Sequence, residues 1–405
     1  MPAIWKNNKN LKPAEILDRI ESIRTVDSEG KASFSGLELK ELLAALHTMV
    51  DFQDAADELN KSSTVWRAVA NVVGPLTKDA VLTAINAEIA RQKAVPASDF
   101  RILTSLSLDC GDFPKILKID GAKLELLPNQ YGKQYGAREA LIKNARLPVP
   151  SVDSDYCRVV VSVKSKGVYG AITKALKVLD IQRAIWCMLG NPSMHFGSRG
   201  WIPINVIRLG AIHSIHLPSG EPASKDVWFE PNFVEATRFR PAQPEQFRVD
   251  AAYLLRRLFA SPYREKLVEA LLRYVRAFDE RDQNTAFIKA WGALETLASP
   301  GNANYDQIVR RCAFLHTEGQ YHRQILEHLR ACRNQSVHAG DQTESAKLHC
   351  YQAQGYFASL FVFHLRNVKI FKSLDDANSF LDLPPDIELL RRRERMTRKA
   401  IRFVM

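Results

Sequence analysis

The amino-acid sequence predicts an α+β protein that is predominantly α-helical and is built from three successive regions. At both ends of the chain, apolar residues recur at helical spacing, whereas the middle contains short apolar runs separated by turn residues. Five prolines between positions 218 and 244 indicate loops and a boundary near residue 245. We therefore expect a helical region over residues 1–96, a mixed α/β domain with a sensor or regulatory role over 97–245, and a helical bundle over 246–405. A chain of 405 residues with 46% hydrophobic content is long enough for two or three such domains.

The first region is expected to be mostly helix. Three sets of apolar residues follow helical spacing: Ile16, Ile20 and Ile23; Leu42, Leu43 and Leu46; Val65, Val69 and Val72. Pro75 ends the third pattern, and a further helix is predicted over about residues 78–93.

Strands are predicted in the middle region. They are expected at residues 103–108, 116–119, 124–127, 158–163 and, once or twice, within 206–217. Asp120-Gly121 is a hairpin turn signal between the second and third of these strands. A helix is expected over about residues 168–189, directly after the fourth strand, so the domain should mix both kinds of element.

The last region is expected to be almost entirely helical, with Asp250 as the first N-cap. Apolar residues from Phe287 to Ala298 follow the i, i+3, i+4, i+7 spacing of a helix with one buried face. Further helices are predicted over about residues 322–338 and 344–371. These lengths and short connections are typical of an up-and-down helical bundle.

Charge and cysteine content favour a protein that binds an anionic partner and disfavour a zinc-binding or disulfide-rich protein. The formal net charge of +11 favours an anionic partner, nucleic acid before membrane. The six cysteines contain no Cys-x-x-Cys pair, and their wide spacing predicts reduced core thiols rather than a zinc site or a disulfide framework. Polar residues occupy the place of an N-terminal apolar segment, and no apolar run is long enough to cross a bilayer. We therefore expect a soluble cytoplasmic protein with no membrane partner.

Arg333, Asn334 and His338 form an Arg-Asn-x-x-x-His string at the end of the expected 322–338 helix. Arginine can hold charge that develops on phosphate oxygens, and histidine can transfer a proton near neutral pH. At about 100° per residue, Arg333 lies at the edge of the apolar stripe, so it should contact another helix, a ligand or a second subunit. Asn334 and His338 share a different face. Bringing all three together requires the long reach of Arg333, a distorted last turn or a second copy of the motif across a symmetric interface.

This string and its setting resemble the signature of the HEPN superfamily (the higher eukaryotes and prokaryotes nucleotide-binding domain), many members of which are metal-independent ribonucleases. The resemblance covers roughly residues 250–375. It includes the upstream helix Ala290–Leu297, which is similar to the Trp/Leu-x-Ala-Leu-Glu-x-Leu helix often found before the motif, and the helix end before Gly340. It implies a HEPN-like four-helix bundle that forms a homodimer, with two motifs facing each other in one composite RNA-cleaving site.

The chemistry that this resemblance implies is attack of the RNA 2′-oxygen on the adjacent phosphate, with no metal and no cofactor. His338 would move a proton, Arg333 would stabilise the charged phosphate, and Asn334 would orient His338 or a phosphate oxygen. Bacterial members with a variable N-terminal part before an Apea-like HEPN domain are often anti-phage or abortive-infection nucleases. The resemblance therefore implies a toxin or defence effector that cleaves tRNA or mRNA and responds to a phage-derived trigger or an antitoxin.

Other residues have weaker signals. Glu295 lies beside the apolar stripe of its helix and is a candidate supporting contact of Arg333; a surface glutamate or a structural ion-pair partner is an equal alternative. The C-terminal basic residues form either a solvated helix face, an RNA contact or a contact with an acidic partner; they are Arg391, Arg392, Arg393, Arg395 and Arg398, followed by Lys399 and Arg402. His213, His216 and His328 are interpreted as structural or exposed rather than as metal ligands, and Cys332 as a core residue rather than a nucleophile. The alternative to a nuclease is a non-catalytic RNA-binding or protein-interaction scaffold with the same bundle.

Overall fold

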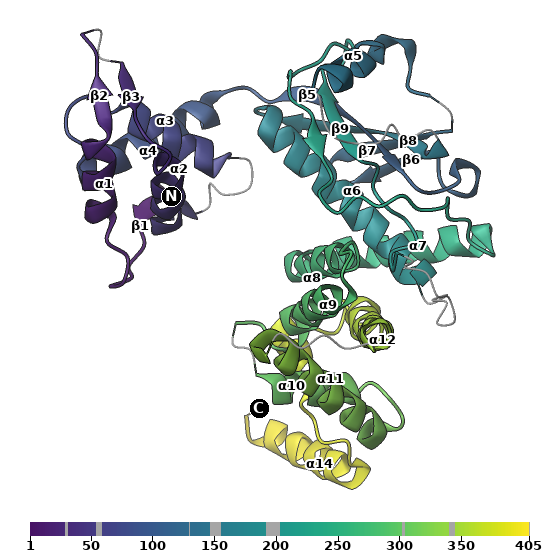
Figure 1. Cartoon of the computed structure of the whole chain (residues 1–405). Coiled ribbons are helices and arrows are strands. Elements are labelled where there is room, and N and C mark those ends of the chain that lie inside the picture. The colour runs from purple at the N-terminus through teal and green to yellow at the C-terminus, as the bar shows by residue number, and fades with distance from the viewer. Residues whose placement is uncertain are drawn as a thin grey trace.

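A computed structural model of the chain describes residues 1–28, 31–53, 59–128, 130–145, 155–191, 203–301, 304–339 and 345–404. Within these ranges the protein is α+β and mostly helical, which confirms the predicted fold class. Figure 1 shows a small N-terminal unit, then an antiparallel sheet with a long helix, then a stack of helices that ends at the C-terminus.

The N-terminal unit is helical, as predicted, and it also contains short strand pairs that the sequence did not indicate. Its helices are α1 (Pro13–Ser22), α2 (Leu39–Met49), α3 (Lys61–Asn71) and α4 (Lys78–Ala94). Its strands are β1 (Ile4–Trp5), which pairs with β4 (Val50–Asp51), and β2 (Arg24–Val26), which pairs with β3 (Ala32–Phe34). Ile20, Leu46, Val65 and Ile85 are fully buried in a core that belongs to this unit alone. Helical spacing therefore located the helices correctly.

A six-stranded antiparallel sheet follows, in the order β10-β9-β5-β8-β7-β6. Its strands are β5 (Ser98–Leu106), β6 (Ile116–Ile119), β7 (Ala122–Leu127), β8 (Cys157–Ser165), β9 (Ile212–His216) and β10 (Trp228–Phe229). The two central strands, β5 and β8, pair along their full lengths. Asp120 and Gly121 join β6 to β7 with positive φ angles of 47° and 74°, which confirms the predicted hairpin turn.

The long helix α6 (Val168–Gly190) packs against one face of this sheet (Figure 1). Along β8, Val159 and Val161 join the core that contains α6, whereas Val160 between them belongs to a cluster on the opposite face. This alternation is the two-residue period of a strand. Between β7 and β8 the chain forms the short helix η3 (Lys133–Tyr135) and α5 (Ala137–Asn144).

The remainder of the described chain is helical. It comprises α7 (Pro244–Ala260), α8 (Arg264–Ala277), α9 (Gln283–Ala298), α10 (Tyr305–Ala313), α11 (Gly319–Ala339), α12 (Ala346–Arg366), α13 (Leu374–Leu381) and α14 (Ile387–Val404). The prediction that Asp250 caps the first of these helices is wrong. The helix begins at Pro244, because proline's fixed φ and missing N–H suit the first helical position, and Asp250 lies within it.

One hydrophobic core runs from the sheet through α6 into the C-terminal helices. It includes Ile102 of β5, Ile185 of α6, Leu271 of α8 and Leu360 of α12, each with no exposed surface. The helices after residue 245 therefore share their core with the sheet, whereas the N-terminal unit has a core of its own. The expected helices after residue 245 are present, and the predicted domain boundary there stays a prediction.

A buried ion network lies where α6, α8 and the sheet meet. Arg183 on α6 is fully buried, and its Nη2 lies 2.8 Å from Asp180 Oδ1 and 2.6 Å from Asp279 Oδ2. Asp279, just after α8, also lies 3.2 Å from Arg208, and Arg276 reaches Asp180 and Glu230 at 2.6 and 2.8 Å. Because each buried charge has a partner, the network fixes α6 and α8 to the sheet.

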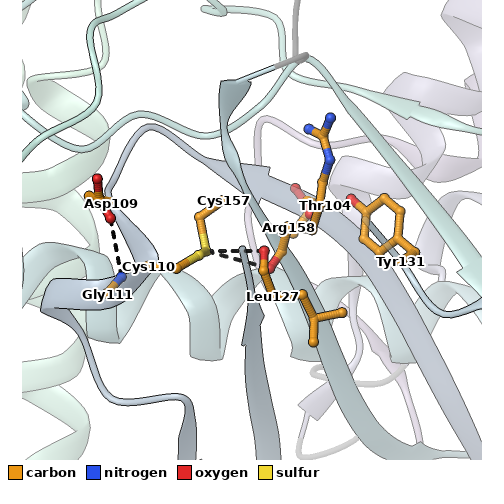
Figure 2. The surroundings of a disulfide bond; sticks show 8 residues. All are labelled: Thr104, Asp109, Cys110, Gly111, Leu127, Tyr131, Cys157 and Arg158. Atoms are coloured by element: carbon orange, nitrogen blue, oxygen red, sulfur yellow. Dashed lines mark hydrogen bonds between the residues drawn. A yellow bond between two sulfur atoms is a disulfide. The ribbon is translucent and has the colours of Figure 1, made fainter. Parts of the chain in front are cut away.

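The prediction that all six cysteines are reduced thiols is wrong. Cys110, in the short helix η2 (Cys110–Asp112), is disulfide-bonded to Cys157 at the start of β8, with the two Cα atoms 5.7 Å apart (Figure 2). Sequence spacing did not indicate this disulfide, because pairing between distant strands brings the two cysteines together. Leu106 at the end of β5 pairs with Cys157, and Cys110 follows four residues later. Cys187, Cys312, Cys332 and Cys350 are free. Among the described residues, no helix has the length and apolar character needed to span a bilayer.

Candidate functional site around Arg333

α11 places Arg333 at the edge of the hydrophobic core. Leu326 and Leu329 on the same helix have no exposed surface, while the Arg333 side chain is 17% exposed. The position beside the apolar stripe predicted that this arginine would pack against a neighbouring element, and the structure confirms it.

The Arg333 guanidinium contacts α9, α10 and the residue next to it in α11. Its Nη2 lies 3.6 Å from Oε1 of Glu295 on α9, and its central carbon lies 5.0 Å from the ring centre of Tyr305 on α10. Nη1 donates a 3.3 Å hydrogen bond to Oδ1 of Asn334. Its Nε is buried and has no hydrogen-bond partner among the described residues. The guanidinium is therefore fixed in place while part of its donor capacity remains unused.

Glu295 compensates the charge of Arg333 only in part. Burial raises the pKa of the Glu295 carboxyl, although the positive charges of Arg333 and then Arg273 act to lower it. The 3.6 Å separation of Glu295 and Arg333 is longer than the roughly 2.7–2.9 Å of a strong charge-assisted hydrogen bond. A contact between Glu295 and Arg333 was one of the alternatives that the sequence left open. Its geometry leaves the two groups loosely paired.

Asn334 and His338 complete the sequence motif. Asn334 is half-buried and its amide oxygen faces Arg333, so the structure brings together Arg333, Asn334 and Glu295. The backbone of His338 belongs to the last turn of α11, but its side chain lies outside the described residues, as does Gly340. Convergence of His338 with Arg333 therefore stays a prediction.

The C-terminal helix α14 exposes its basic residues. None of its described residues is buried, and its cations are Arg391, Arg392, Arg393, Arg395, Arg398, Lys399 and Arg402. Two of them form ion pairs within the helix, Arg391 with Glu388 at 2.9 Å and Arg398 with Glu394 at 2.7 Å. The helix is thus a solvent-facing cationic surface, as expected, and its partner stays a prediction.

His328 and Cys332 lie close to a third residue, His349, that the sequence did not single out. Cys332 Sγ lies 3.7 Å from Nε2 of His328 on α11 and 4.0 Å from Nε2 of His349 on α12. Burial raises the pKa of the Cys332 thiol, which agrees with the interpretation that it is no nucleophile. A signal for part of this cluster was available, because residues four apart share a helix face. His349 could be connected to the pair only by the packing of α12.

His213 and His216 are both buried in β9, in keeping with their interpretation as structural residues. Nδ1 of His213 lies 2.7 Å from the Thr104 hydroxyl, and its Nε2 lies 3.9 Å from Glu230. Burial opposes ionisation of Glu230, but the nearby His213 and the charge of Arg276 lower the pKa of this carboxyl to about 2. His213, Glu230 and Arg276 line a cavity of about 700 Å³. They belong to, or directly contact, the ion network between sheet and helices.

No protein-family model, no curated protein and no solved structure matches this chain. The resemblance to the HEPN superfamily therefore rests on the motif and on the helices described above.

Proposed function

We propose that this protein is a HEPN-type endoribonuclease whose cleavage chemistry needs no metal ion, and that it acts as a toxin or anti-phage effector. The observation that carries the proposal is the environment of Arg333. Its guanidinium is fixed by the Tyr305 ring and loosely paired with Glu295, yet its buried Nε has no partner among the described residues. A phosphate oxygen is a suitable acceptor for such donors. The net charge of +11 supports an anionic substrate.

In the proposed reaction, the 2′-oxygen of RNA attacks the adjacent phosphorus and the bond from phosphorus to the 5′-oxygen breaks. The products are a 2′,3′-cyclic phosphate and a 5′-hydroxyl end. His338 transfers a proton in this step, and Arg333 donates hydrogen bonds to the phosphate oxygens as their charge grows. Asn334 holds Arg333, the role that its 3.3 Å contact supports.

We further propose that the active form is a homodimer in which two motifs face each other. At about 100° per residue, positions 333 and 338 fall on different faces of a helix, so a two-fold axis would allow one subunit to supply what the other lacks. Mixing wild-type protein with an excess of His338→Ala protein should suppress activity more than dilution does, once subunits have exchanged. A monomer by light scattering with full activity would contradict the composite site.

The central test is cleavage of total RNA by purified full-length protein in the presence of a chelator, with mapping of the ends. Arg333→Ala and His338→Ala should each reduce the rate by about 10²–10⁴-fold, because general acid–base catalysis and charge stabilisation have effects of this size. Arg323→Ala is the matched control, because Arg323 is an exposed arginine on the same helix. Equal cleavage by wild type and both motif variants would mean a contaminating nuclease.

A non-catalytic RNA-binding scaffold is the alternative, and the exposed cations of α14 favour it. Replacing Arg392, Arg395 and Arg398 together by glutamine tests this surface directly in a filter-binding assay. Salt-dependent RNA binding that these changes abolish, together with no cleavage by wild type, would support the scaffold over the nuclease.

A further inference from the structure

Three side chains of metal-binding type meet where α11 and α12 approach each other. His328 and Cys332 are four residues apart on α11 and therefore lie on one face of that helix. His349 is on the first turn of α12. One ligand atom from each of the three residues lies within 4.8 Å of the other two. Two imidazoles and a thiol are a donor set that suits zinc.

The sulfur–nitrogen separations are close to those around a tetrahedral ion. With Zn–S of about 2.3 Å and Zn–N of about 2.0–2.1 Å, a tetrahedral site places sulfur and nitrogen about 3.6 Å apart. Cys332 Sγ lies 3.7 and 3.8 Å from the two ring nitrogens of His328 and 4.0 Å from Nε2 of His349. The sulfur lies almost equally far from both nitrogens of His328, so a rotation of that exposed ring would direct one of them at the ion.

The hydrogen bonding of His349 points in the same direction. This side chain is only 2% exposed, and its Nδ1 has no hydrogen-bond partner among the described residues. The contact of its Nε2 is with the Cys332 sulfur, which is a weak hydrogen-bonding group. A buried imidazole with so few hydrogen bonds destabilises the folded protein, whereas a coordinated cation would give its nitrogen a strong partner.

Exposure decreases across the cluster in a way that gives a metal ion access. His328 is exposed, Cys332 is half-buried and His349 is buried. The inner two ligands are held by helix packing, and the His328 ring can rotate in from solvent to close the site. An entry path and preorganised inner ligands are both features of functional metal sites.

We propose that His328, Cys332 and His349 bind one Zn²⁺ ion and leave a fourth coordination position for water or another small ligand. The ion would tie α11 to α12, the two helices on either side of the 340–344 segment. The site is separate from the proposed cleavage chemistry, because none of its three ligands belongs to the Arg-Asn-x-x-x-His motif. Its contribution would be to fix the helix that carries the motif.

The test is metal binding by full-length protein, handled without oxygen and without added thiols. After dialysis against Zn²⁺ and then buffer, elemental analysis should find one zinc per chain. Replacing zinc with Co²⁺ should produce the intense visible bands of tetrahedral cobalt and a thiolate-to-cobalt charge-transfer band in the near ultraviolet. Zinc should also raise the thermal unfolding midpoint.

Cys332→Ser, His349→Gln and His328→Gln should each weaken zinc binding by at least about 100-fold, and Cys332→Ser should remove the charge-transfer band. Cys350→Ala and His322→Gln are matched controls, the first beside His349 and the second on α11, and both should bind like wild type. Circular dichroism without metal shows whether each variant is folded. His328→Gln changes an exposed side chain and keeps the test decisive if an inner variant unfolds. Wild-type protein that binds no zinc, or a His328→Gln protein that binds it unchanged, would overturn the proposal.

Discussion

His364 shows how one buried side chain can make the whole fold sensitive to acid. It lies in α12 with no exposed surface, its Nδ1 is 3.1 Å from the Tyr263 hydroxyl, and its Nε2 has no hydrogen-bond partner among the described residues. Burial lowers the pKa of His364 from 6.5 to about 3. The folded protein therefore keeps this imidazole neutral at a pH where the unfolded chain protonates it.

This difference predicts a loss of stability on acidification. Because the folded pKa is depressed, the contribution of His364 is fully present above the unfolded pKa of 6.5 and declines as the pH falls toward about 3. Between about pH 7.5 and about pH 5, the free energy of unfolding should fall by about 2 kcal/mol more in wild type than in His364→Gln. Urea denaturation at both pH values measures the difference. Parallel losses in the two proteins would show that His364 does not carry the effect.

At the scale of elements, the ion network around Asp279 connects α6 and α8 to the sheet. Burial would raise the pKa of the Asp279 carboxyl, but the charges of Arg183 and Arg208 lower it overall. Its two oxygens accept hydrogen bonds of 2.8 and 2.6 Å from Arg183. Asp279 is thus a shared counter-ion for buried guanidinium groups, which cannot lose their charge in a protein.

We expect Asp279→Ala to lower the free energy of unfolding by about 3–5 kcal/mol, because it leaves buried arginine charge without a partner. The control is Asp306→Ala, which removes an ion pair with Arg330 in which the aspartate is 80% exposed. Exposed pairs contribute only about 0–1 kcal/mol, so this change should be nearly neutral. Denaturant titrations of both variants measure the free energies of unfolding. Similarly small decreases in both would show that the buried arginines do not need Asp279 as a partner.

The elements that the sequence predicted well are those set by local periodicity. Helical spacing gave α1 to α4, α9 and α11 within a few residues, and the Asp120-Gly121 turn gave the β6–β7 hairpin. The sequence misplaced the start of α7 because Asp250 and Pro244 are competing helix-start signals, and the helix begins at the proline.

The Cys110–Cys157 bond and the position of His349 beside Cys332 depend on residues far apart in sequence, which no local pattern encodes. The Arg-Asn-x-x-x-His motif could be recognised in the sequence, but the contact of Arg333 with Tyr305 could be found only in the structure.

At the scale of the whole molecule, the described residues form two large hydrophobic cores, beside smaller clusters such as the one around Val160. The first belongs to the N-terminal unit, and the second extends from the sheet through α6 to α13. The connection between them, residues 94–99, is exposed. Parts with separate cores and an exposed connection can unfold separately.

We therefore expect two unfolding transitions by calorimetry, one for the N-terminal unit and one for the rest of the chain. Limited proteolysis should cut first between residues 94 and 99, and the larger fragment should keep its own transition unchanged. The loop before Pro244 is the internal comparison, because the core is continuous across it and no separate transition should arise there. A single cooperative transition, with no preferred cut at the connection, would show that the two cores are energetically coupled.

The disulfide between Cys110 and Cys157 imposes a redox condition on every experiment with this protein. It closes a segment with a sequence separation of 47, and opening such a loop costs about 4 kcal/mol in the chain-entropy account. A thiol reductant strong enough to protect Cys332 would also open this bridge and loosen the end of the β5–β8 pair at Cys157. Zinc binding requires Cys332 to stay reduced, whereas the Cys110–Cys157 bridge must stay oxidised. Excluding oxygen, without adding a reductant, preserves both in one sample.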